Sequence, residues 1–450
     1  MNENELFLDL NVGLPLDIDQ YKKAGDFDKA IKLIDELLTK GVNDTHLRNS
    51  LILQKEIMKR TVYDYPHTMD DALRILKDKN DSFTMEDLER YMDEKRFSWV
   101  YINKEIRILD RFDGCLLRYE DYRKKINEYK DINIEDTDRY KMISKIKSQG
   151  HLEHKIRITH SIKIKDEYFK KGMKVTVHIP IPKVCEHQKD IVIEKCSDNP
   201  IISDENHKYR TVCFKKEMNE NETFFVTYSY TSYYDYIDLN KYVPEECDIK
   251  EYLNEEYPHI VFTDHLRKLT ADITKDCDND LGKAKAIYDY ITLNMNYSFQ
   301  PAYFIRDNIP EYTVNNLRGD CGFFALTFIT MCRIAGIPAH FESGLYVGKD
   351  DVGAHDWAKF YIKPFGWLYA DPSFGVGSRM GNDEESRKYF FGNLDYERMT
   401  ANSGYYPKFE IEKKYFSNDP FDNQTGEIET DERGLRDTET QHSITGEYYD

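Results

Sequence analysis

The spacing of apolar residues changes near residue 150, and this change constrains the fold more than any other feature of the chain. Before it, apolar residues recur at helical spacing, as in the segment from Tyr21 to Gly41. After it, apolar and polar residues alternate, as at Ile156 and Ile158. The two patterns have different periods and predict helices and strands, respectively. Because they occur in separate blocks, the chain is expected to fold as an α+β protein.

The length of 450 residues is too great for one ordinary domain. Residues 1–145 are predicted to form a helical domain. Residues 146–248 contain several alternating runs divided by Gly, Asp and Asn clusters, which predicts a β-sandwich. Residues 416–450 are polar and acidic with little periodicity, so we expect a loosely ordered tail there.

The helical block carries local signals of two kinds. The segment 21–41 is similar to one tetratricopeptide-type helical hairpin, but a solenoid needs several copies, so an irregular helical domain is the simpler interpretation. A protein-docking module is the alternative. Thr68-x-x-Asp71 and Thr84-x-x-Asp87 each precede an apolar run and are predicted to be capping boxes.

Residues 318–373 hold a cysteine, a histidine and an aspartate, each in its own local setting. Cys321 begins an almost wholly apolar segment that runs to Ile334, and Gly336 and Pro338 follow it. This pattern predicts a buried helix that starts at the cysteine. Unpaired backbone N–H groups and the helix dipole at that position favour a thiolate, a state that a nucleophile needs.

His355 begins an aromatic run that is expected to form a strand, and Asp371 ends the following run. The turn residues Pro364 and Gly366 between them predict a hairpin that brings the aspartate toward the histidine. Pairing centred on Lys363 would place the two directly opposite each other. The turn chemistry indicates a slightly later centre, so a bulge or a strong twist is expected to bring them together.

Taken together, these settings resemble the transglutaminase-like superfamily of papain-related thiol enzymes, of the bacterial type. The resemblance implies that residues 249–415 form a transglutaminase-like (papain-like) core, preceded by the β-sandwich and the helical domain. It also implies a triad with Cys321 as nucleophile, His355 as base and Asp371 as the group that orients the imidazole. The matching motifs are Gly319-Asp320-Cys321, Gly336-Ile337-Pro338-Ala339, His355-x-Trp357, and Gly366-Trp367 leading to Asp371-Pro372.

Neighbouring residues are candidates for the substrate cleft. Trp357 belongs to the matched motif, and His340 begins the strand-like run that leads toward His355. Asp320 is a plausible N-cap, and its charge opposes formation of a thiolate. Asp356 occupies a position where the family often has a small residue, and strand alternation predicts that it points away from the cleft.

The resemblance implies a cysteine hydrolase or acyltransferase that cleaves a peptide or carboxamide bond through a thioester on Cys321. Hydrolysis is favoured over transamidation, because transamidation needs a second amine site and exclusion of water. The alternatives are a protein-glutamine transamidase that forms cross-links, or a non-catalytic peptide-binding module. No cofactor is expected. A metal site built from Cys321, His340, His355 and Asp371 would lack closely spaced ligand pairs, so none is predicted.

The formal charge of −19 and the pI near 5.2 disfavour nucleic acid and anionic membrane surfaces as partners. A protein or peptide substrate is therefore the expected partner. The eight cysteines are scattered without a CxxC pair, which is typical of free thiols in a reducing compartment. The first residues resemble no secretory signal, and no long apolar stretch is found, so a cytoplasmic location is expected.

Overall fold

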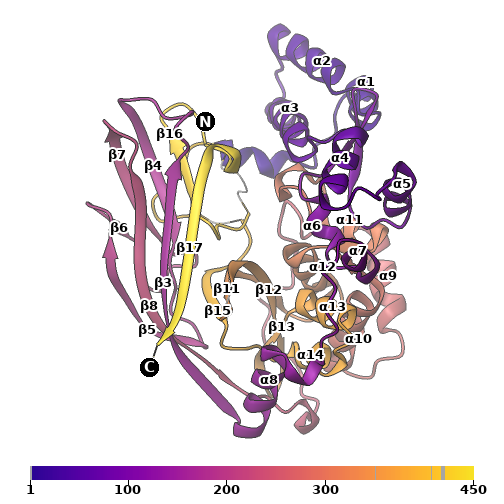
Figure 1. The fold of residues 1–450 in the computed structure, drawn as a ribbon, viewed down its shortest axis with the longest axis vertical. Coiled ribbons are helices and arrows are strands. Elements are labelled where there is room, and N and C mark those ends of the chain that lie inside the picture. Colours follow the sequence, from indigo (N-terminus) through magenta and orange to yellow (C-terminus); the bar gives the residue numbers. More distant parts are fainter. Residues whose placement is uncertain (1–2, 350, 407, 417–420, 450) are drawn as a thin grey trace.

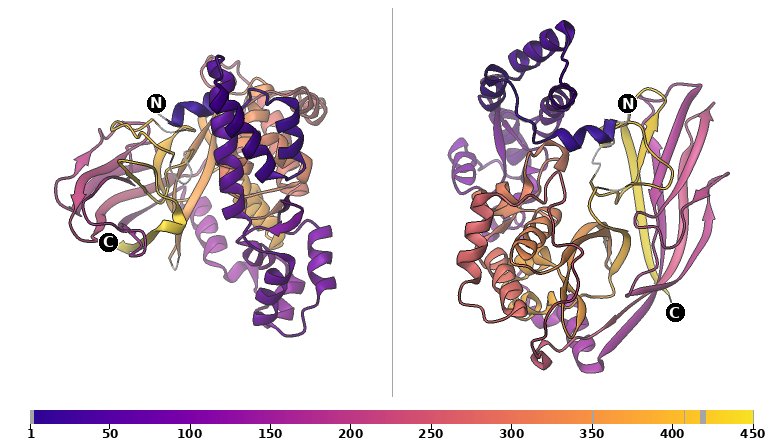
Figure 2. Two further views of the ribbon diagram at one scale, coloured as in Figure 1. Left: turned by 90° about the horizontal axis from the view of Figure 1, so that it is seen from above. Right: turned by 180° about the vertical axis from the view of Figure 1, so that it is seen from behind.

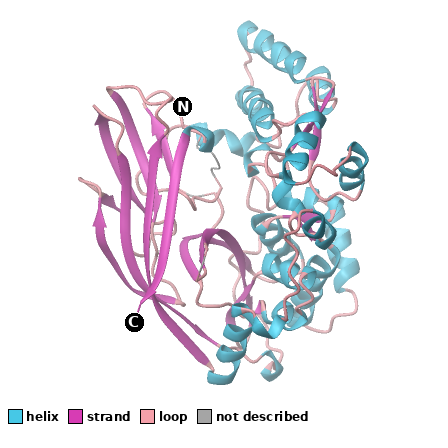
Figure 3. Ribbon diagram, in the orientation of Figure 1, coloured by secondary structure: helices cyan, strands magenta, loops and turns pink. Residues whose placement is uncertain are grey.

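The computed structural model describes residues 3–349, 351–406, 408–416 and 421–449, and it confirms the α+β class. Helices gather on one side of the molecule and a tall β layer on the other, with a smaller sheet between them (Figures 1 and 3). Within the described residues, no helix is both long enough and apolar enough to cross a bilayer.

The N-terminal helices begin where their sequence signals indicate. Thr68 and Thr84 each accept a hydrogen bond from the backbone N–H three residues on, and the carboxylates of Asp71 and Asp87 accept from the threonine backbone, so both capping boxes are confirmed. The segment similar to a tetratricopeptide hairpin contributes the end of one helix and all of the next. The elements are η1 (Glu3–Asp9), α1 (Leu16–Lys23), α2 (Phe27–Lys40), α3 (Thr45–Asp64), α4 (Met69–Lys79), α5 (Met85–Asp93), β1 (Trp99–Ile102), β2 (Glu105–Ile108), α6 (Phe112–Leu116), α7 (Glu120–Lys125), η2 (Ile134–Asp136) and α8 (Asp138–Gln149).

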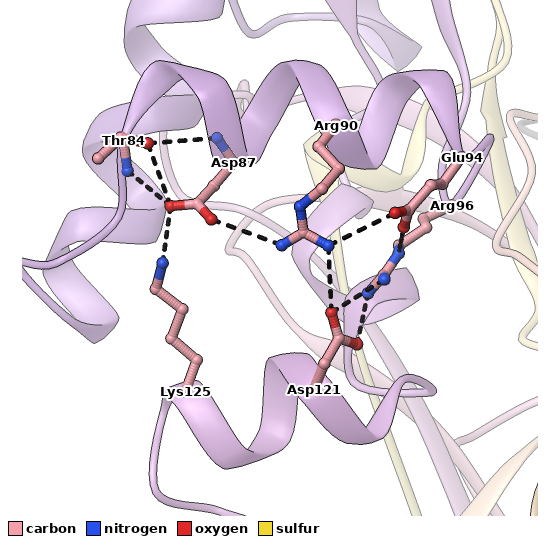
Figure 4. A network of polar contacts seen from close by, with 7 residues as sticks. All are labelled: Thr84, Asp87, Arg90, Glu94, Arg96, Asp121 and Lys125. Carbon is pink, nitrogen blue, oxygen red and sulfur yellow. Dashed lines mark hydrogen bonds and ion pairs between the residues drawn. The ribbon is translucent and has the colours of Figure 1, made fainter.

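A network of charged side chains ties α7 to α5 (Figure 4). The buried guanidinium of Arg96 donates two hydrogen bonds to Asp121 on α7, at 2.7 and 2.9 Å. Lys125 donates to Asp87 on α5 at 2.7 Å, and Arg90 contacts both carboxylates. The bidentate Arg96–Asp121 pair fixes both distance and orientation, so it carries more of the helix contact than a single exposed ion pair would.

We expect Asp121→Ala to weaken the contact between α5 and α7 by about 1 kcal/mol. This is the contribution of a hydrogen bond between charged groups, reduced because the Asp121 carboxylate is exposed to solvent. Hydrogen exchange measured by mass spectrometry should show faster exchange in the peptides that cover α5 and α7. Glu120→Ala on the same helix is the control, since Glu120 forms an exposed ion pair with its neighbour Lys124. Equal exchange in the two variants would contradict this assignment.

The tall β layer contains two four-stranded sheets that share one apolar core, with strand orders β17-β3-β8-β5 and β16-β4-β7-β6. Its inward residues include Ile158, Val177, Phe214 and Tyr228, all buried. The helix before it, α8, continues past the predicted boundary at residue 145. The strands are β3 (His151–Ile164), β4 (Met173–Pro180), β5 (Gln188–Cys196), β6 (Ile201–Ile202), β7 (Thr211–Met218), β8 (Thr223–Asp235), β16 (Glu427–Thr430) and β17 (Thr440–Tyr449).

The prediction of a loose tail over 416–450 is wrong for its described part. β16 pairs with β4, and β17 pairs with β3 along its whole length. β17 is an edge strand whose side chains are mostly half-buried or exposed. Such a strand needs few apolar residues, because its stability comes from the ladder and from a partner surface far away in the sequence. The polar composition of this segment therefore did not predict strand β17.

The first helical turns and the C-terminal segment share a cluster of aromatic rings. Phe7 of η1 lies edge-on to Phe304, Phe416 and Phe421, with ring centroids 4.8, 5.3 and 4.8 Å away. Phe304 belongs to the middle of the chain, so this cluster joins three segments that are remote in sequence. Each edge-to-face pair stabilises the contact beyond the area that it buries.

The sheet between the two layers has the order β14-β13-β12-β11-β15. The predicted helix from Cys321 to Ile334 forms as α12 and packs on one face of it, where Phe328 meets Phe360 with ring centroids 5.4 Å apart. Leu345 of the same sheet joins the core of the β layer. The remaining elements are η3 (Leu239–Lys241), α9 (Asp264–Thr274), α10 (Asp280–Asn294), β9 (Asn296–Tyr297), η4 (Tyr303–Ile305), α11 (Ile309–Asn316), β10 (Arg318–Gly319), β11 (Ala339–Val347), β12 (Val352–Ile362), β13 (Gly366–Ala370), α13 (Pro372–Met380), α14 (Glu384–Tyr389), β14 (Phe391–Gly392), β15 (Arg398–Ser403) and η5 (Asp437–Glu439).

The hairpin of β12 and β13 has the later centre that its turn residues predict. Ile362 pairs with Gly366 and Ala358 with Ala370, which centres the ladder on Pro364. The register is regular over these pairs, so the expected bulge does not form between the described strands. Continued by one residue, this register sets Asp371 opposite Trp357. It therefore lies diagonally across from His355 on the same face, within reach of a side-chain contact.

Candidate active site

Cys321 lies at the first turn of α12. Asp320 is its N-cap, as predicted, and accepts a hydrogen bond from the backbone N–H of Phe323 at 3.2 Å. The next residue, Gly322, has no room for a side chain because the ring of Tyr303 lies against it. A Cβ at this position would come within 2.1 Å of the phenol oxygen. The thiol therefore lies at the N-terminal end of the helix, beside a carboxylate and a phenol.

His355 and Asp371 are in contact. Nε2 of His355 lies 2.7 Å from Oδ2 of Asp371, and both side chains are buried. Asp371 also caps α13, since its Oδ1 accepts from the backbone N–H of Phe374 at 2.8 Å. The cap and the imidazole use different oxygens, so the carboxylate is fixed from two sides. Because Nε2 faces Asp371, Nδ1 is the ring nitrogen left to exchange a proton with a thiol.

Arg398 is a part of the site that sequence reasoning missed. This fully buried residue of β15 forms ion pairs with Asp371, at 2.9 Å, and with Asp395, at 3.0 Å. No local motif marks it. Burial by itself would raise the pKa of Asp371, but the charges of His355 and Arg398 lower it to about 2. Burial lowers the pKa of His355, which Asp371 partly offsets.

Asp356 points toward the thiol, which contradicts the expectation that it faces away from the cleft. Its Oδ2 lies 3.4 Å from Sγ of Cys321, and the Asp356 backbone N–H also faces the sulfur. The reason is the packing of β12. Phe360 touches α12, so strand alternation directs Asp356, four residues earlier, to the helix side as well. Among the described residues, the hydrogen bond of the thiol runs to Asp356, and none joins it to His355.

The surroundings of Cys321 favour the protonated thiol. Burial raises its pKa well above the usual value, and the negative charges of Asp356 and Asp320 raise it further. Burial also raises the pKa of Asp320 to about 6. The hydroxyl of Tyr303 lies within hydrogen-bond distance of both carboxylates, at 3.0 Å from Asp320 and 3.2 Å from Asp356. In this arrangement a thiol whose neutral form is favoured lies among acidic groups.

Two of the predicted cleft residues lie elsewhere. Trp357 is fully buried in a separate core with Tyr234 and Tyr389, so it cannot line a cleft. His340 lies between the rings of Tyr252 and Trp367. It pairs in register with Lys359, whereas His355 pairs with Gly344 further along β11. In the described part of the chain, no group of three or more His, Cys, Asp or Glu side chains could hold a metal ion.

Residues 267–372 match the model of the transglutaminase-like superfamily. An uncharacterised protein of Bacillus subtilis (strain 168), YebA, is 25% identical over 130 residues, which is 25% of this chain and 18% of that protein. An uncharacterised protein of Haemophilus influenzae is 24% identical over 193 residues, which is 35% of this chain and 52% of that protein. The chain therefore spans at most about half the length of these curated relatives.

Two solved structures resemble parts of the chain. A protein of Cytophaga hutchinsonii described as a candidate cysteine protease gives a TM-score of 0.43 at 18% identity, over 67% of this chain and 93% of that chain. The periplasmic domain of TgpA from Pseudomonas aeruginosa gives a TM-score of 0.30 at 14% identity, over 51% of this chain and 92% of that chain.

Asp356→Asn should lower the pKa of the Cys321 thiol, because it removes a negative charge that opposes the thiolate. The midpoint of iodoacetamide labelling at Cys321, followed by mass spectrometry against pH, should move down by about one unit, a shift typical of one adjacent charge. Glu342→Gln, a buried carboxyl on the neighbouring strand, is the control and should leave the midpoint in place. An unchanged midpoint in Asp356→Asn would contradict the observed contact.

Arg398→Met should destabilise the core by about 3–5 kcal/mol, because it leaves Asp371 and Asp395 buried without their cation. Thermal unfolding followed by circular dichroism measures the loss. Arg74→Met, in which an exposed ion pair with Asp71 is removed, should cost less than about 1 kcal/mol. Because the pKa of Asp371 is lowered when folded, its share of the stability is present above about pH 4 and is lost as the pH falls toward 2.

Proposed function

Because residues 267–372 make this chain a member of the transglutaminase-like superfamily, we propose that it is a cysteine enzyme of acyl transfer that hydrolyses a peptide or carboxamide bond. Cys321 is the nucleophile, His355 the base and Asp371 the orienting group. The observation that carries the proposal is the buried 2.7 Å contact between His355 and Asp371, next to the peptide group that touches the Cys321 sulfur.

The reaction begins when the Cys321 sulfur exchanges its contact with Asp356 for the Nδ1 atom of His355, which takes the proton. The thiolate then attacks the carbonyl carbon of the substrate, and the backbone N–H of Cys321 stabilises the oxyanion. The imidazolium returns its proton to the leaving amine or ammonia as the C–N bond breaks, which leaves a thioester. Water, deprotonated by the same imidazole, resolves the thioester to a carboxylic acid and restores the thiol.

Asp371 and Arg398 serve this cycle by holding the imidazole. The carboxylate stabilises the imidazolium that forms in each half-reaction, while Arg398 keeps the carboxylate ionised and fixed. The substrate is a protein or peptide, and water is favoured over a second amine as the acceptor. All eight cysteines are unpaired in the structure, which supports a reducing compartment, and we propose the cytoplasm as the location.

A second function has one observation in its favour. The contact between Cys321 and Asp356, together with the raised pKa of the thiol, suits a peptide-binding module that retains the cleft without turnover. The two functions differ in whether the reactivity of the Cys321 thiol depends on His355. In an enzyme the reactivity depends on the imidazole, whereas in a binding module it does not.

The first test compares iodoacetamide labelling of Cys321 at neutral pH in the wild type, His355→Ala and Asp371→Asn. In an enzyme, loss of the base should slow labelling at Cys321 about tenfold, and Asp371→Asn should slow it less. His265→Ala, which removes an exposed imidazole, is the control. Incubation with glutamine-containing peptides, analysed by mass spectrometry, should then show hydrolysis that Cys321→Ala abolishes. Labelling that is indifferent to His355 would favour the binding module.

A further inference from the structure

The C-terminal segment before β16 is fixed against the active-site layer. Phe421 is fully buried and stacks on Tyr405, with ring centroids 5.1 Å apart. The carbonyl of Asn423 accepts a hydrogen bond from the side chain of Asn402 on β15, at 3.0 Å. In Figure 2 this yellow part of the chain runs between the β layer and the central sheet.

The carbonyl of Thr425 is fixed as well. It accepts from the imidazoles of His160 on β3 and His442 on β17, at 3.0 and 2.6 Å. The residue between Asn423 and Thr425 is thus anchored on both sides. The backbone on both sides therefore fixes the direction of its side chain, because both flanking carbonyls accept hydrogen bonds from buried or half-buried groups.

That residue is Gln424, and its carboxamide lies next to the nucleophile. Nε2 of Gln424 donates to Oδ1 of Asp356 at 2.6 Å, while Oδ2 of the same carboxylate lies 3.4 Å from Sγ of Cys321. Gln424 is almost fully buried. One carboxylate therefore bridges a primary carboxamide and the thiol, and the hydrogen bond from amide to carboxylate is of the stronger, charge-assisted kind.

We propose that Asp356 is a specificity-determining residue that binds the N–H₂ group of a carboxamide beside Cys321, and that Gln424 fills this position in the closed protein. The inference rests on the proposed function of Cys321 and extends it. A carboxylate in this place accepts an amide donor and repels a second carboxylate. It therefore admits amide side chains, rejects acidic ones and helps to expel an acidic product.

The exchange of Gln424 for a substrate amide costs little at Asp356, because one amide donor replaces another. Opening therefore depends on how firmly Phe421, Asn423 and Thr425 hold the segment. In the closed form Gln424 both occupies the subsite and keeps Asp356 against the thiol. The segment acts as an internal competitor of the substrate.

The test uses two reagents that differ only in this chemistry, iodoacetamide as the amide and iodoacetate as the acid. Labelling of Cys321 is measured by mass spectrometry and normalised to Cys277 in the same molecule. Gln424→Ala should raise the iodoacetamide rate at Cys321 about tenfold and the iodoacetate rate far less, since the subsite is vacated but keeps its charge. Gln441→Ala, an exposed glutamine on β17, is the matched control and should behave as the wild type.

The double variant Gln424→Ala/Asp356→Asn should lose the preference for the amide reagent. Gln424→Glu, of nearly equal shape, should also open the site at neutral pH, because two carboxylates would meet where the amide donates now. Circular dichroism confirms that the variants are folded. The proposal is overturned if the Gln424 variants label within twofold of the wild type, or if the preference survives in the double variant.

The experiment distinguishes failure of this inference from failure of the proposed function. If the chain is not an enzyme, His355→Ala leaves labelling unchanged while Gln424→Ala still exposes an amide-selective thiol. If the subsite is wrong, labelling still depends on His355 while the Gln424 variants match the wild type.

Discussion

The buried guanidinium of Arg398 is the interaction on which the site depends. It lies on β15, at the edge of the central sheet, and reaches Asp371 at the end of β13, which β11 and β12 separate from β15. Through Asp371 it sets the position of His355 and the N-terminus of α13 at once. A buried charge of this kind is destabilising unless every partner is present. Loss of Arg398 or of either carboxylate would therefore disrupt the whole cluster. The imidazole on β12 thus depends on residues from strands on both sides of it in the sheet.

The second constraint is the packing of α12 on β12. The helix is nearly all apolar and almost completely buried, so close packing leaves it little freedom to shift on the sheet. This packing brings Cys321 next to the peptide group of Asp356 and therefore next to an acidic side chain. The same contact that builds the core also holds the thiol in its neutral form. Stability and reactivity are opposed at this point, as is common in active sites.

The sequence predicted the parts of the molecule whose signals are local. Helix α12, both capping boxes and the later centre of the β12–β13 hairpin follow from residues close together in the chain. Asp356 was expected on the wrong face, because alternation counted from His355 does not reveal which face the helix covers. Arg398 had no local signal at all. Strand β17 was missed because the ladder that stabilises it is formed with β3, remote in the sequence.

The aromatic cluster around Phe7 has a consequence for the biosynthesis of the protein. Phe7 has Phe416 and Phe421 among its partners, and both are synthesised long after it. The central sheet and α12 can assemble earlier, since their contacts lie within residues 267–372 and their neighbours. A nascent chain would therefore carry the Cys321 thiol without Gln424 beside it until residues 421–449 have left the ribosome.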